Sequence, residues 1–156
     1  MKILFLDFDG VLHPLSAGEQ LDPHAPISDA IGNPALFCYA QTLADLIAPH
    51  KSVGIIVHST WRLFTPDNDI VTLLGPLGRH FSGVTPRATR YESIRWLVQQ
   101  NRLRDFRIID DAPGEFPRGL RELIVCDSER GISERAVQDQ IRHWLQDTEY
   151  FEHCGA

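Results

Sequence analysis

Four short apolar runs constrain the fold of this chain more than any other feature of its sequence. They cover residues 3–6, 53–57, 106–109 and 123–126, and each is largely apolar rather than alternating. Near-continuous apolar runs are typical of parallel β-strands that are covered on both faces, whereas a strand with one wet face alternates. The runs therefore predict a central parallel sheet.

Segments with helical signals separate these runs. Asn33 and Pro34 form a cap and first-turn pair before an amphipathic segment. Thr89 with Glu92 makes a capping box before a second such segment, and Ser133 can cap a third. Because strand and helix alternate along the chain, we predict an α/β fold with helices on both faces of the sheet.

The length of the chain predicts a single domain. It has 156 residues, and no linker, repeat or low-complexity tract divides residues 1–156. Residues 13–33 depart from the pattern because prolines, glycines and polar residues dominate them. We interpret them as a loop or small flap insert, since a structureless loop of this length in a compact domain usually has a function.

Composition narrows the function classes. The net charge of −6 argues against broad, non-specific binding of nucleic acid. No apolar stretch approaches the ~20 residues of a membrane span, so we expect no membrane partner. Three cysteines without a C-x-x-C pair indicate reduced thiols and a cytoplasmic location. The first run begins at residue 3, so we expect no signal peptide.

Polar side chains follow each apolar run at its carboxyl end. Ligands of open α/β sheets bind at this edge, so these residues are the candidate site. They are Asp7 and Asp9, Ser59 and Thr60, Asp110 and Asp111, and Asp127. On an extended strand, Asp7 and Asp9 would share one side at ~7 Å, where two carboxylates repel each other unless a cation, a shared proton or solvent intervenes. Asp127 is more simply explained as a turn acid.

These motifs resemble the haloacid dehalogenase (HAD) superfamily of aspartate-nucleophile phosphohydrolases. Asp-Phe-Asp-Gly-Val at residues 7–11 matches the first HAD signature, Ser59 after its strand matches the second, and the Asp110–Asp111 pair matches the fourth. The order and spacing fit over nearly the whole chain. Residues 12–13, 58–62 and 127–133 further resemble the small HAD domains of RNA-repair ("Swiss Army Knife") proteins.

The resemblance implies a Rossmann-like, three-layer α/β/α sandwich with a minimal cap or none. It also implies an Mg²⁺-dependent phosphatase in which Asp7 attacks phosphorus to form an aspartyl-phosphate. Asp9 then serves as general acid and base and offers its backbone carbonyl to the metal. Asp7 and Asp110 complete the expected metal ligands, and Asp111 binds through water or orients Asp110. Ser59 and Thr60 are expected to hold the phosphoryl oxygens.

The chain departs from the HAD pattern at the third signature, which is usually a lysine near a helix start. Its two lysines, at positions 2 and 51, are not placed for that role. Arg90, in the first turn after Thr89, is the candidate replacement, and Arg87 is the alternative. A cation at a helix N-terminus is disfavoured by the helix dipole, so an arginine there is better explained if it faces an anion. A solvated surface arginine is the competing explanation.

Three functions stay open at this level. The first is a phosphatase with an open site for bulky phosphoesters such as nucleotides or nucleic-acid ends. The second is a catalytically inactive binding or regulatory domain, for which the missing lysine is the only sequence support. The third is a phosphotransferase. His13 and His58 flank motif residues and could touch substrate, although packing or hydrogen bonding explains them more simply. We interpret Trp61 as core packing, while Arg62 suits a structural ion pair or a substrate contact equally well.

Overall fold

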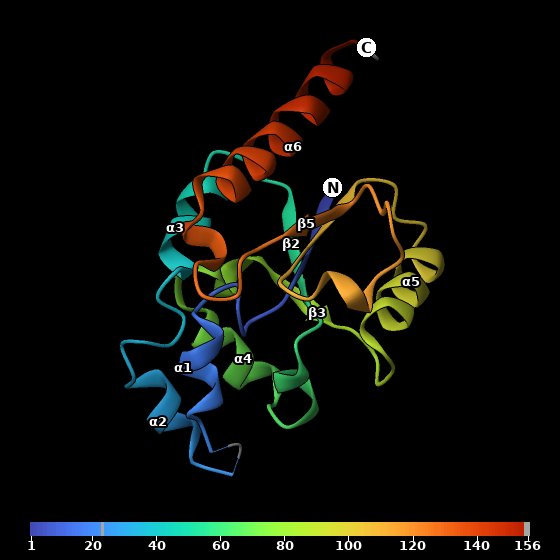
Figure 1. The fold of residues 1–156 in the computed structure, drawn as a ribbon. Helices are drawn as coiled ribbons and strands as arrows, with labels where there is room; N and C mark the ends of the chain where they lie inside the picture. The colour runs from blue at the N-terminus through green and yellow to red at the C-terminus, as the bar shows by residue number, and fades with distance from the viewer. Residues whose placement is uncertain (23, 155–156) are drawn as a thin grey trace.

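The computed structural model describes residues 1–22 and 24–154, with the backbone alone described from residue 148 onward (Figure 1). Its centre is a five-stranded sheet in the order β3-β2-β1-β4-β5. All strands are parallel, as the apolar runs predict. In chain order they are β1 (Lys2–Leu6), β2 (Val53–Val57), β3 (Phe81–Val84), β4 (Phe106–Asp110) and β5 (Leu123–Val125).

Helices cover both faces of the sheet, which confirms the predicted three-layer α/β/α class. The helices α3 (Ala40–Ile47) and α6 (Arg135–Cys154) lie on one side of it, and α5 (Arg90–Gln100) lies on the other (Figure 1). Shorter elements fill the connections: α1 (Leu15–Glu19), α2 (Ile27–Ile31), α4 (Asp67–Leu74) and the 3₁₀ turns η1 (Thr60–Leu63), η2 (Gly75–His80), η3 (Pro113–Glu115) and η4 (Gly131–Ser133).

The side chains of β1 divide between two apolar clusters. Leu4 and Leu6 belong to the larger cluster, which includes buried residues of α3, α4 and α6. Ile3 and Phe5 belong to the smaller cluster with Ile94 of α5. Successive strand residues point to opposite faces, so β1 contributes to both clusters. Residues of β1 with odd numbers therefore face α5.

Several local predictions need correction. The strand β3 was not predicted, because Ser82 and Gly83 interrupt its apolar character. The helix expected directly after Pro34 begins only at Ala40, after a series of turns. Thr89 precedes α5 as expected, but its side chain makes no capping hydrogen bond.

The predicted cap of the last helix is also misplaced. Ser133 lies in η4, and α6 begins two residues later at Arg135. Residues 13–33 contain the two short helices α1 and α2 rather than a structureless loop. Within the described chain, every helix is too short or too polar to serve as a bilayer span.

Candidate active site

Three buried side chains meet at the carboxyl edge of the sheet. Asp7, His58 and Asp110 each offer a ligand atom, and these atoms all lie within 4.8 Å of one another. Parallel pairing explains the convergence. Leu6 of β1 is in register with Val57 of β2 and with Ile109 of β4, so the residues that follow these three are neighbours. The same alternation that turns Ile3 and Phe5 toward α5 turns these three side chains toward that face.

The two carboxylates differ in their surroundings. Burial raises the pKa of Asp7 well above its usual value, the nearby Asp110 raises it further, and Arg90 opposes the rise. Burial also acts on Asp110, but hydrogen bonds from His58 and the Ala112 N–H, together with the charge of Arg90, hold its pKa below the usual range. Two adjacent buried acids therefore depend on cationic partners to remain ionised together.

Arg90 bridges these acids from the first residue of α5. Its Nη1 donates to Asp7 Oδ2 at 3.1 Å and to Asp110 Oδ1 and Oδ2 at 2.8 and 2.9 Å. The arginine at this helix start does face anions, and they are protein carboxylates. Its expected role toward a phosphoryl group stays a prediction.

His58 is a component of the site for which sequence reasoning favoured packing or hydrogen bonding over a substrate contact. Its Nε2 lies 2.8 Å from Asp110 Oδ2, and burial lowers the pKa of the ring. The neutral ring can donate from Nε2 to the carboxylate. Nδ1 is buried and has no hydrogen-bond partner among the described residues. His58 directly precedes Ser59, and the register of β1 with β2 places it beside Asp7. This position is the sequence signal that could have identified His58 as a site residue.

Asp9 does not join this group. The strand β1 ends at Leu6 and the chain turns at Gly10 with φ +78°, so the extended spacing expected between Asp7 and Asp9 does not apply. The Asp9 carboxylate lies 2.7 Å from His13 Nε2 and accepts a 3.0 Å hydrogen bond from Trp61 Nε1.

The tautomer of His13 follows from its second contact. The Phe37 N–H donates to Nδ1 at 3.2 Å, so that nitrogen is an acceptor. The ring proton therefore lies on Nε2 and is donated to Asp9. His13 and Trp61 together hold the Asp9 carboxyl from two sides.

Asp111 lies beside the turn at Gly10. A Cβ atom on Gly10 would come within 2.1 Å of Asp111 Oδ2, which together with the positive φ explains the glycine. Burial raises the pKa of Asp111, and Asp110 adds to the rise. The role of Asp111 as an indirect metal ligand stays a prediction.

Ser59 is fully buried and Thr60 is exposed. The Ser59 Oγ accepts a hydrogen bond from Trp61 N at 3.2 Å and so caps η1. Its hydroxyl proton remains available for an acceptor. Thr60 faces a neighbouring cavity. The expectation that both bind phosphoryl oxygens is compatible with their place at the sheet edge.

Arg62 fixes this edge of the sheet. Among the described residues its guanidinium donates to backbone carbonyls and forms no ion pair, so the expected ion pair is wrong, while a substrate contact stays a prediction. The five acceptors, at 2.8–3.2 Å, belong to His58, Ser59, Thr85, Pro86 and Ala88. These bonds tie the end of β2 to the segment that leads into α5, and thereby help to place Arg90.

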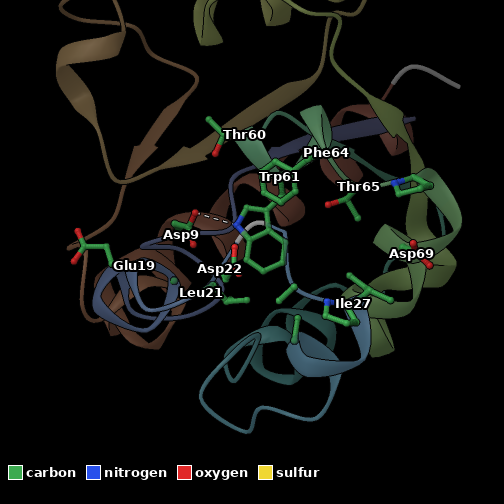
Figure 2. Close-up of a pocket in the computed structure, with 15 residues that line it drawn as sticks. Asp9, Glu19, Leu21, Asp22, Ile27, Thr60, Trp61, Phe64, Thr65 and Asp69 are labelled. Carbon is green, nitrogen blue, oxygen red and sulfur yellow. Dashed lines mark hydrogen bonds between the residues drawn. The ribbon is translucent and has the colours of Figure 1, made fainter.

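A cavity of about 450 Å³ opens beside Asp9. The segment containing α1 and α2 forms one wall, and η1 with the start of α4 forms the other. Figure 2 shows Trp61 directed into the cavity with its ring nitrogen toward Asp9. The flap predicted at residues 13–33 thus lines a space next to the proposed general acid.

A model of the family described as the HAD domain in Swiss Army Knife RNA repair proteins matches residues 3–137. The matched range contains β2, β3, β4 and β5 completely, β1 except for its first residue, and every candidate site residue. No curated protein and no solved structure matches the chain.

Proposed function

The chain belongs to the family of HAD domains in Swiss Army Knife RNA repair proteins, and from that premise we propose that it is an Mg²⁺-dependent phosphatase. Membership places it in the HAD-like hydrolase superfamily. The observation that carries the proposal is the pair of buried carboxylates, Asp7 and Asp110, joined by Arg90 at the ligand-binding edge of a parallel sheet.

The residues of this edge suit a divalent cation. Buried carboxylates side by side are costly unless positive charge compensates them, and carboxylate oxygens are ligands that Mg²⁺ prefers. Asp7 and Asp110 would hold the ion, with the backbone carbonyl of Asp9 and, indirectly, Asp111 as further proposed ligands. When bound, the ion supplies positive charge that offsets the repulsion between a carboxylate and a phosphate.

Asp7 is the proposed nucleophile. One carboxylate oxygen accepts from the Phe8 N–H at 2.8 Å and the other from Arg90, so the group is held in a fixed orientation. Attack on phosphorus forms an aspartyl-phosphate as the ester oxygen departs, and water then cleaves this intermediate to release phosphate. Arg90 and Ser59 are the proposed donors to the phosphoryl oxygens.

Asp9 is the proposed general acid and base. It would give a proton to the departing oxygen and take one from the water that hydrolyses the intermediate. His13 and Trp61 position its carboxyl group for both steps.

The substrates stay a proposal. The family description names RNA repair proteins, so nucleotides and nucleic-acid ends are the first phosphoesters to assay.

The free thiols of Cys38 and Cys126 support a reducing, cytoplasmic setting. The inactive-domain alternative depended on the missing lysine, and the contacts of Arg90 with the two acids weaken that argument.

The deciding experiment is hydrolysis of p-nitrophenyl phosphate and a nucleotide panel with Mg²⁺ or with EDTA. We expect Mg²⁺-dependent turnover that Asp7→Asn abolishes and that Asp45→Asn, an exposed control on α3, retains. Turnover by Asp7→Asn at the rate of the wild type would show that Asp7 is not the nucleophile. Failure of the wild type on the whole panel would favour the binding-domain alternative.

A further inference from the structure

The proposed reaction leaves the cavity beside Asp9 without a role. We propose that it receives the leaving group of the substrate and selects an aromatic alcohol that carries no negative charge. This inference rests on the proposed function, because it takes Asp9 as the group that protonates the departing oxygen. That oxygen must lie within hydrogen-bond reach of Asp9, so the rest of the leaving group extends into the space that Asp9 lines.

Aromatic and aliphatic side chains give this cavity a surface for a flat ring. Trp61 and Phe64 line one wall with ring centroids 6.0 Å apart and planes tilted by 35°. Leu21 and Ile27 line the facing wall, which the flap supplies. Phe64 is 51% exposed, an unusual state for a phenylalanine within a concave site. A ring packed against it would remove that apolar surface from water.

The charged side chains of the cavity are all acidic. Besides Asp9, they are Glu19, Asp22 and Asp69, and no lysine or arginine is among the described residues that line it. Figure 2 shows Asp9, Glu19 and Asp22 on one side of the space and Asp69 on the other. An anionic leaving group would meet repulsion from several directions, whereas a neutral or cationic one would not.

The size of the cavity supports a single small leaving group. Its volume of about 450 Å³ lies in the range of small-molecule sites. One ring system with its linker fits such a space, while the additional phosphates of a longer nucleic-acid strand would have to lie outside it. The cavity thus favours a monoester of one neutral ring unit over a polyanion.

Three matched esters test the charge preference. They are 2-phenylethyl phosphate and its para-carboxylate and para-aminomethyl derivatives, in which the ethyl spacer keeps the alcohol chemistry nearly constant. We expect kcat/KM for the carboxylate to be about tenfold below the parent, as its charge approaches the wall carboxylates. The aminomethyl ester should equal or exceed the parent. Equal kcat/KM for all three esters would overturn the proposal.

Variants locate the effect in the cavity. Asp22→Asn and Asp69→Asn should each reduce the penalty on the carboxylate ester, whereas Asp29→Asn, an exposed acid of α2 outside the cavity, should not. Phe64→Ala should lower kcat/KM for 2-phenylethyl phosphate but not for ethyl phosphate, and Leu63→Ala is its control. An unchanged ester preference in the cavity variants would contradict the proposal.

A binding measurement separates this inference from the proposed function. In Asp7→Asn, which is designed not to turn over, the three esters are titrated and backbone amide shifts are followed by NMR. The cavity assignment is supported if Leu21, Ile27 and Phe64 shift with the esters whose leaving group is neutral or cationic, but not with the ester whose leaving group is a carboxylate. This support holds even if the wild type hydrolyses nothing. Absence of shifts at these residues overturns it even if the phosphatase activity is found.

Discussion

Removing the Arg90 guanidinium should destabilise this protein more than removing any exposed arginine. The side chain is 23% exposed and donates to Asp7 and Asp110, whose side chains are 2% and 1% exposed. In Arg90→Ala both carboxylates stay buried without their cation. Loss of one partner of a buried ion pair typically costs about 3–5 kcal/mol.

Proton uptake limits this cost. Burial already raises the pKa of Asp7, so this acid can take a proton when Arg90 is absent and relieve part of the repulsion. We therefore expect Arg90→Ala to lower the free energy of unfolding by about 3 kcal/mol at pH 7 in EDTA, at the lower end of the range for broken buried pairs. Arg90→Lys should lose less of this free energy, because the ammonium group retains the positive charge. It should still lose some, because one ammonium cannot reproduce all three contacts.

Urea unfolding measures the change, and Arg87→Ala is the matched control. Arg87 lies in the same segment, is exposed and, within the described part of the chain, donates only to the Leu63 carbonyl at 2.9 Å, so we expect a loss within about 0.5 kcal/mol. In a double-mutant cycle, Arg90→Ala should cost less in an Asp7→Asn background. Equal losses in Arg90→Ala and Arg87→Ala would refute the view that Arg90 compensates buried charge.

Three further predictions test other parts of the site. In Gly18→Ala, the new Cβ would lie 2.0 Å from Asp9 Oδ1, so the Asp9 carboxyl must move. We expect kcat to fall about tenfold or more while the circular dichroism spectrum stays unchanged. Burial lowers the pKa of His58 from 6.5, so the unfolded chain binds the proton first and the free energy of unfolding should fall as pH drops below 6.5; urea titrations at several pH values should show a weaker fall in His58→Gln than in the exposed control His24→Gln. Mg²⁺ should raise the melting temperature of the wild type by binding the folded state, and Asp110→Asn should abolish the rise measured by calorimetry.

The elements that local sequence predicts well are those formed by a continuous pattern. The apolar runs of β1, β2, β4 and β5 correspond to strands, and the central strand β1 is covered on both faces, as a continuous apolar run predicts. The strand β3 escaped prediction because Gly83 breaks its short pattern and its pairing with β2 contains a register shift between Ile55 and Ile56. Its place in the sheet depends on a neighbour that the local sequence does not specify.

Arg90 illustrates an inference that local physics began and tertiary structure completed. A cation at a helix start is unfavourable by itself, which correctly suggests a nearby anion. The anions are Asp7 and Asp110, 83 and 20 residues away in the chain. Nothing in the helix sequence specifies these partners, because the packing of α5 against the sheet brings them together.

The sequence by itself determined the α/β class and the polar residues that end each strand, because both follow from hydrophobic pattern and residue type. The tertiary structure decided which of those residues share a site. Parallel register aligns Asp7, His58 and Asp110 on the face toward α5, while the turn after β1 places Asp9 at the cavity that residues of α1 and α2 line. Register and turn geometry depend on hydrogen bonds between distant segments, so residue identity alone cannot separate these two groups.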